Sequence, residues 1–274
     1  MFCDYHVHTA YSDDSSYPME QVITDAVGMG MDEICITDHV DYGVKIDTDE
    51  LKQRNDWKGE LNVDYESYFE EIVKLQQRFG EKIAIRQGME FGVQKHTIVK
   101  YEKLFSKYAF DFIILSCHQV DDQEFWTQDF QRGRTQQEYN ERYYEAIHEV
   151  MKSYKNYSVL GHLDLIRRYD PAGQYSFARV SDQVREILKT AVYDGKGIEV
   201  NTSSIRYRLD GWMPSWNILN MYRELGGEII TVGSDCHEKS HLGAHIKRAM
   251  EELKEAGFRY VCTYEKMKPV FHKL

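Results

Sequence analysis

Histidines and carboxylates recur directly after apolar, strand-like runs of this chain. The first pair is His6 and His8, in Asp4-Tyr5-His6-Val7-His8-Thr9. Because side chains alternate faces along a strand, residues at i and i+2 point the same way and can bind one ion. The pattern repeats in Thr37-Asp38-His39, Gly88-Met89-Glu90, Ser116-Cys117-His118, Gly161-His162 and Gly233-Ser234-Asp235-Cys236-His237. Ligand-type residues gathered at the carboxyl ends of strands indicate a metalloenzyme.

Strand-like and helix-like segments alternate along the chain, and these elements must position the ligands. Seven strand-like runs cover residues 4–9, 33–36, 83–85, 112–115, 157–160, 197–201 and 229–232. Apolar residues at helical spacing predict helices at 18–27, 65–79, 135–154, 181–191, 216–225 and 244–256. Thr135 and Glu138 form a capping box, and Ser181 is interpreted as an N-cap. Strict alternation predicts an α/β fold whose mostly parallel sheet is closed, or nearly closed, into a barrel.

No composition break or Gly/Ser-rich linker divides the 274 residues, so a single domain over 1–274 is expected. The longest irregular stretches, 42–64 and 120–134, follow candidate ligand strands and are interpreted as active-site walls. In the second stretch, Phe125, Trp126 and Phe130 either cover an organic substrate or pack the loop down. The sequence does not decide between these two roles.

The net charge of −11, from 45 acidic and 34 basic residues, offers no basic stripe for nucleic acid. We expect no membrane span and no secretory signal, because no long apolar stretch occurs and the start lacks a basic region. Five cysteines without framework spacing indicate reduced thiols, and the cytoplasm is the expected compartment. Whether the chain forms a homo-oligomer stays open.

The ordered motif set described above resembles the polymerase and histidinol phosphatase (PHP) superfamily over nearly the whole chain. The resemblance implies a distorted (β/α)7 TIM-like barrel, that is, a PHP metal-dependent phosphoesterase domain over 1–274. The seven strand-like runs agree with that strand number independently. The activity implied is that of a phosphomonoesterase that hydrolyses L-histidinol phosphate to L-histidinol and phosphate in histidine biosynthesis. Its partner would be a small-molecule phosphomonoester, with neither nucleic acid nor membrane involved.

The same resemblance implies two to three divalent metal ions and their ligands. The first ion would take His6, His8, Glu90 and Asp235; the second would share Glu90 and add His118 and His162; the third would take Asp14, His39 and His237. Mixed nitrogen and oxygen sites suit zinc, iron and manganese alike. Cys117 and Cys236 are excluded as ligands, because strand alternation turns them away from the adjacent motif histidines.

The chemistry expected of this site is attack by a hydroxide that bridges two ions, with Glu90, Asp235 and His237 as the catalytic residues. Arg167 and Arg168 follow the strand that leads to His162, and Arg206 follows the 197–201 strand. All three are candidates for binding the phosphate. Neighbouring residues rarely both face inward, so one of Arg167 and Arg168 is expected to lie at the surface.

Three alternatives to this activity remain. The first is another PHP phosphoesterase, acting on nucleic acid or nucleotides; the acidic balance of the chain disfavours it. The second is a phosphotyrosine-protein phosphatase, which the motifs alone do not exclude. The third is a barrel that binds partners without catalysis, which the nine intact ligand positions disfavour.

Overall fold

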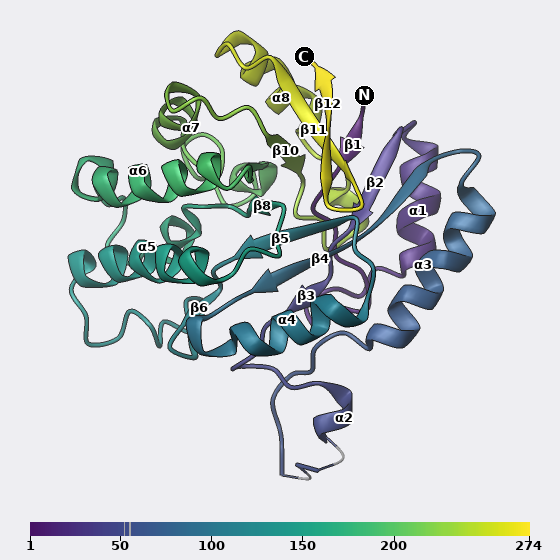
Figure 1. The fold of residues 1–274 in the computed structure, drawn as a ribbon, viewed down its shortest axis with the longest axis horizontal. Coiled ribbons are helices and arrows are strands. Elements are labelled where there is room, and N and C mark those ends of the chain that lie inside the picture. The colour runs from purple at the N-terminus through teal and green to yellow at the C-terminus, as the bar shows by residue number, and fades with distance from the viewer. Residues whose placement is uncertain (52, 55) are drawn as a thin grey trace.

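Parallel strands form a nearly closed barrel, and helices pack around its outside (Figure 1). The structure is a computed structural model that describes residues 1–51, 53, 54 and 56–274. Across the main sheet the strands are β1 (Cys3–Asp4), β2 (Glu33–Ile36), β4 (Ala84–Gly92), β5 (Phe112–Ser116), β8 (Val159–Leu160), β9 (Gly197–Asn201) and β10 (Ile230–Gly233). Neighbours in this order are parallel, and β3 (His39–Val40) also pairs with β4. The predicted α/β barrel of a single domain is confirmed.

The barrel closes where the first and last strands meet. The amide of Tyr5 donates to the carbonyl of Val232 at 3.1 Å, and the amide of Cys236 donates to the carbonyl of His6 at 3.1 Å. A third hydrogen bond, from the amide of His8 to the carbonyl of Cys236, measures 2.8 Å. This seam is short, because Val7 and Cys236 form only an isolated parallel bridge there.

Most of the helices lie where the spacing of apolar residues predicts a helix. They are α1 (Met19–Gly28), α2 (Thr48–Leu51), α3 (Tyr65–Phe79), α4 (Ile98–Lys107), α5 (Gln136–Ser153), α6 (Phe177–Tyr193), α7 (Trp216–Glu224) and α8 (Ile246–Glu255). Figure 1 shows α5 and α6 side by side on one flank of the barrel, with α1 and α3 on the other. The capping box before α5 is confirmed: Thr135 Oγ1 accepts from the Glu138 amide, and the Glu138 carboxylate accepts from the Thr135 amide.

Several helices differ from the sequence prediction. Ser181 is not an N-cap, because α6 begins at Phe177 and the Ser181 hydroxyl donates back to the carbonyl of Ala178 inside the helix. Helix α4 and the short helix α2, which lies in the stretch interpreted as irregular, were not predicted. The apolar residues of α4 are spread among lysines, although Ile98, Tyr101 and Leu104 are buried.

A C-terminal hairpin that the sequence did not predict closes the amino-terminal end of the barrel. It consists of β11 (Tyr260–Glu265) and β12 (Lys268–Lys273), which pair antiparallel. The amide of Tyr264 donates to the Tyr5 hydroxyl at 2.7 Å, and the Phe112 ring lies 4.9 Å from that of Tyr5 and 5.0 Å from that of Tyr264. These aromatic rings fill the amino-terminal end of the barrel, opposite the candidate metal ligands.

Two further sequence predictions can be compared with the described residues. The cysteines are all free and buried, as expected of reduced thiols. Among the helices of the described residues, none combines the length and apolar character needed to cross a lipid bilayer.

Candidate metal centre

The nine predicted ligand residues converge at the carboxyl end of the barrel. They form four overlapping groups, and within each group one nitrogen or oxygen atom per residue lies within 4.8 Å of the others. The groups are His6, His8 and Asp235; His6, Glu90 and His162; His39, Glu90 and His118; and His8, Asp14, His39 and His237. Glu90 lies inside β4, which runs to Gly92, so the prediction that it follows the end of its strand was wrong.

Glu90 is at the centre of the cluster and is fully buried. Its Oε1 lies 3.0 Å from His118 Nε2 and 2.8 Å from His162 Nε2 and accepts a hydrogen bond from Ser116 Oγ at 2.6 Å. Its Oε2 faces three other histidine nitrogens: His39 Nδ1 at 2.9 Å, His6 Nε2 at 3.2 Å and His8 Nε2 at 3.5 Å. One carboxylate therefore joins two sets of histidines, as a bridging ligand must.

Asp235 completes the side of the cluster that contains His6 and His8. Its Oδ1 lies 3.5 Å from His8 Nε2 and 3.8 Å from His6 Nε2, and its Oδ2 accepts from Ser203 Oγ at 3.1 Å. The backbone of Asp235 has a φ of 54°, in the left-handed region that non-glycine residues rarely adopt. This turn directs the carboxylate back over the barrel mouth.

Asp14, His39 and His237 meet at the more exposed edge of the cluster. Asp14 Oδ2 lies 2.9 Å from His237 Nε2 and 3.4 Å from His39 Nε2. Burial tends to raise the pKa of Asp14, but charge on His39 and the hydrogen bond from His237 outweigh it and hold that pKa below its usual range. The carboxylate is therefore ionised and available as an oxygen ligand.

Several buried atoms of the cluster have no hydrogen-bond partner among the described residues. They are His6 Nε2, His8 Nε2, His39 Nδ1 and Glu90 Oε2. Buried polar atoms are normally satisfied, and leaving them unpaired is costly. Divalent metal ions would accept lone pairs from these atoms, so the donor set fits such ions.

A cavity of about 420 Å³ opens over the cluster. Glu90, Asp235 and His237 line it, together with Arg168, Arg206, Tyr207 and His241. The guanidinium carbon of Arg168 lies 3.2 Å from the centre of the Tyr207 ring, and its Nη1 lies 4.0 Å from Asp235 Oδ2. The cavity thus combines a cationic wall with the carboxylate and histidine floor.

The two other predicted arginines make structural contacts. Arg206 donates to the carbonyls of Ser234 and Asp235, at 3.1 and 2.7 Å, although it also lines the cavity. Arg167 lies outside the cavity lining, because its guanidinium donates to Asp164 Oδ2 at 2.7 Å and to the Asp210 carbonyl at 3.0 Å. Of the adjacent pair, Arg168 is the residue that faces the cluster.

A profile of the PHP domain matches residues 4–203 of the chain. The chain belongs to the PHP family. The histidinol-phosphatase of Lactococcus lactis subsp. lactis is 30% identical over 271 residues, which cover 97% of this chain and 95% of that protein. A probable histidinol-phosphatase of Clostridium acetobutylicum is 28% identical and covers 95% of this chain and 96% of its own.

A solved structure shares the fold of this chain. The histidinol phosphate phosphatase of Lactococcus lactis, crystallised with zinc, L-histidinol and phosphate, superposes with a TM-score of 0.83. It is 29% identical to this chain, and the superposition covers 98% of each.

Sequence reasoning missed several side chains at this site, among them Asp41 and Lys45. Asp41 Oδ1 lies 2.8 Å from His118 Nδ1, and Asp41 Oδ2 lies 3.3 Å from the ammonium of Lys45. Both residues are buried and line the cavity. The signal for Asp41 was present, because it stands two residues after His39 in an extended segment.

The 42–64 stretch contributes to the cavity wall as predicted, through Lys45 and Glu60. Residues 52 and 55 of this stretch lie outside the described residues.

The aromatic residues of the 120–134 stretch divide between the two predicted roles. Phe125 and Phe130 are fully buried, and the Phe125 ring packs 5.5 Å from that of Tyr143. Trp126 is instead 44% exposed and lines the cavity. Packing therefore explains the two phenylalanines, and Trp126 alone faces the space above the cluster.

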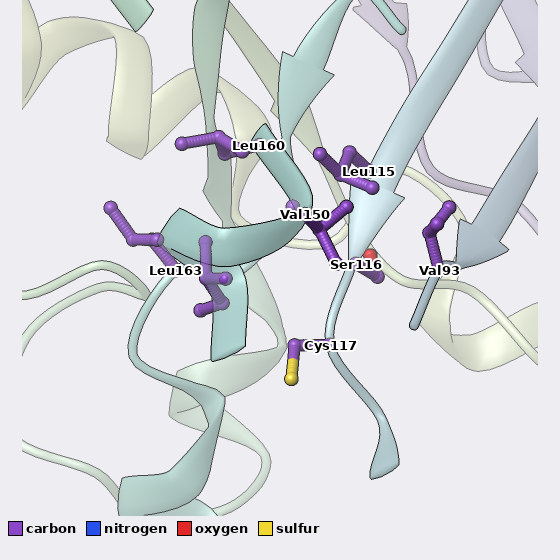
Figure 2. A pocket seen from close by; sticks show the side chains of 9 residues that line it. Val93, Leu115, Ser116, Cys117, Val150, Leu160 and Leu163 are labelled. Atoms are coloured by element: carbon purple, nitrogen blue, oxygen red, sulfur yellow. The ribbon is translucent and has the colours of Figure 1, made fainter. Parts of the chain in front are cut away.

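The two cysteines beside motif histidines point away from the cluster, as alternation predicts. Figure 2 shows Cys117 in a small, mostly apolar pocket with Val150 and Leu163, outside the barrel. Burial raises the pKa of the Cys117 thiol above its usual range, which disfavours a thiolate ligand. The Cys236 thiol faces the carbonyl of Glu238 at 3.2 Å.

Replacing Asp14 with Ala is expected to remove one metal equivalent and to lower turnover while the fold persists. Asp14 offers the only carboxylate of its ligand group, and its side chain is half exposed, so truncation leaves no buried hole. Elemental analysis together with circular dichroism tests this. Asp13→Ala is the matched control, because Asp13 bonds Lys45 and belongs to none of the ligand groups. Full metal content in Asp14→Ala would make Asp14 a loop-stabilising residue.

Proposed function

We propose that this protein is a metal-dependent phosphomonoesterase that hydrolyses L-histidinol phosphate to L-histidinol and phosphate. The observation that carries the proposal is the Glu90-centred cluster on the floor of a cavity whose wall bears Arg168 and Arg206. Full-length relatives named histidinol-phosphatase, one of them solved with L-histidinol and phosphate, support this substrate. The cytoplasm, where histidine biosynthesis uses this step, is the proposed compartment, and the five free cysteines agree with it.

Two to three divalent ions, which we propose to be zinc, iron or manganese, would be held by the nine cluster residues. When bound, they lower the pKa of a coordinated water and neutralise charge on the phosphoryl oxygens. Glu90 would hold ions on both of its oxygens, because histidines from four strand ends face those oxygens. Asp235 and His237, which line the cavity, would hold the ions from that side.

The chain's own groups orient the phosphate. Arg168 has its guanidinium stacked on Tyr207, which fixes the plane from which its N–H groups can donate. Arg206 donates two N–H groups to the carbonyls of Ser234 and Asp235. Its Nε is buried without a hydrogen-bond partner in the described chain. We propose that Arg168 binds the phosphate directly and that Arg206 chiefly holds Asp235 in place.

Arg168→Ala is expected to lower kcat/KM for the phosphomonoester by about 10- to 100-fold. This range corresponds to one charge-assisted hydrogen bond of roughly 1.5–3 kcal/mol. Metal content should stay unchanged, because arginine is not a ligand. Arg167→Ala is the matched control: it removes the same charge one residue away, from a guanidinium that faces Asp164 and Asp210. Steady-state kinetics on both variants decide, and equal losses would remove Arg168 from the phosphate site.

Phosphate release from four substrates tests the activity itself. Wild-type protein loaded with zinc or manganese should hydrolyse L-histidinol phosphate faster than a nucleotide, a dinucleotide ester or a phosphotyrosine peptide. The cavity offers a local cationic wall, whereas a nuclease must follow a chain of diesters with an extended basic track. Faster degradation of single-stranded DNA would make the chain a nuclease with the same metal site. Preference for the peptide would indicate a protein phosphatase, and no turnover of any of them a binding barrel.

A further inference from the structure

Glu199 is a buried carboxylate of β9 that belongs to none of the ligand groups. Its side chain is only 1% exposed, in the otherwise apolar strand Gly197-Ile198-Glu199-Val200. A carboxylate in such a position needs charged or hydrogen-bonding partners, because burial strips it of water. The residues that supply those partners show what Glu199 does.

The two oxygens of Glu199 hold two different histidines. Oε1 lies 2.5 Å from His6 Nδ1, and Oε2 accepts from the backbone amide of His162 at 2.9 Å. Asn201 Nδ2 adds a third contact, at 3.3 Å from Oε2. No lysine or arginine contacts this carboxylate in the described chain, so its ionic partner lies within the metal centre.

These contacts face the opposite side of the histidines from Glu90. His6 Nδ1 points at Glu199 while His6 Nε2 lies 3.2 Å from Glu90 Oε2. His162 is held by its backbone while its Nε2 lies 2.8 Å from Glu90 Oε1. His6 and His162 are thus clamped between two carboxylates, one of which faces the ligand atoms while the other faces away from them.

The strand next to β9 leaves room for this contact only because it carries glycine. A Cβ added to Gly233 of β10 would lie 2.7 Å from Glu199 Oε1 and 2.3 Å from the Cβ of His6. A side chain there would push the carboxylate and the imidazole apart. Gly233 therefore allows the short approach of Glu199 to His6.

We propose that Glu199 is a positioning residue that fixes the proton of His6 on Nδ1 and couples His6 to His162. With Nδ1 protonated toward Glu199, the lone pair of Nε2 is directed at the ion site. Because the same carboxylate anchors the His162 backbone, His6 and His162 are held at fixed positions relative to each other on the two sides of Glu90. The inference rests on the metal site of the proposed function, and not on the identity of the substrate.

Glu199→Gln tests this, with zinc affinity as the readout. The two donors meet different oxygens of Glu199, and a glutamine keeps only one acceptor oxygen, so from the same position it can serve only one of them. We expect zinc binding to weaken by about 10- to 100-fold, the usual effect of losing such a partner. Chelator competition on the purified protein measures it, and excess zinc should restore turnover. The substrate does not enter this measurement, so a wrong substrate assignment and a wrong role for Glu199 are distinguishable.

Glu33→Gln is the matched control. Glu33 is also a strand carboxylate, only 4% exposed, but it pairs with Tyr5 and Arg86 at the other end of the barrel. It should lose stability without losing zinc affinity; an equal loss of zinc in both variants would mean general destabilisation and would overturn the proposal. If Glu199→Gln does not fold, Glu199→Asp decides, since it keeps the charge but is too short to hold both partners. Wild-type zinc affinity in a folded Glu199 variant also overturns the proposal.

Discussion

Replacing Glu90 with Gln is expected to lower kcat/KM by more than about 100-fold, beyond the usual effect of losing a residue that only supports a ligand. The amide has no charge, yet it stands where five histidine nitrogens converge around the two carboxylate oxygens. Its nitrogen would present hydrogens to atoms that must coordinate a cation. Metal analysis should show loss of more than one equivalent, because each oxygen faces a different set of histidines.

Asp14→Asn is the matched comparison for Glu90→Gln, since both changes convert a carboxylate to an amide of the same size. Asp14 lies at the half-exposed edge and faces only one ligand group. The loss of activity and of bound metal should therefore be smaller in Asp14→Asn. Equal losses in the two variants would contradict a bridging role for Glu90.

Removal of the metal ions by a chelator is expected to abolish turnover, by at least about 1,000-fold, because several kcal/mol of charge stabilisation is lost. Zinc, manganese or iron added back should restore it, each to its own level. Turnover and elemental content measured before and after chelation test this. Full activity at less than one equivalent of metal would exclude a metal-dependent reaction.

Reconstitution should also depend on pH. Burial tends to lower the pKa of His118, but the carboxylates of Glu90 and Asp41 outweigh it and raise that pKa to about 9 in the metal-free protein. Below that pH a proton must leave before His118 can donate its lone pair, so acid competes with the ion. Apparent zinc affinity should rise about tenfold per pH unit for each displaced proton between pH 6 and 8, and the contribution of His118 should level off above pH 9. Competition titrations across this range measure it, and a flat profile would exclude such displacement.

Much of the fold follows from local sequence patterns. The strand runs and the stripes of α1, α3 and α5 are apolar at the correct period, which a single sequence displays directly. The exposed strand β12 carries no such signal, because it mixes Lys268, Pro269 and Phe271. The position of the hairpin depends on the contact of Tyr264 with Tyr5, which lies 259 residues away in the sequence. Long-range packing of this kind cannot be inferred from periodicity.

The candidate site divides in the same way. His6, Glu90 and Asp235 stand in motifs whose order and placement are visible in the sequence. Glu199 was also visible, as a lone charge inside an apolar strand, but only the fold shows that it faces His6. The choice between Arg167 and Arg168 could not be made from sequence, because it depends on the turn that directs one guanidinium to Asp164 and leaves the other over the cluster.

The short seam between β1 and β10 has a kinetic consequence. It joins residues some 230 positions apart, such as Asp4 and Ser234, so the entropy of closing a very long loop must be overcome before it forms. We therefore expect the barrel to be completed late in folding and to open first at this seam. His6 and Asp235 lie on the two sides of that seam, so an ion bound by both residues would cross-link the first and last strands. Loading with metal should then slow unfolding of the protein far more than it speeds folding.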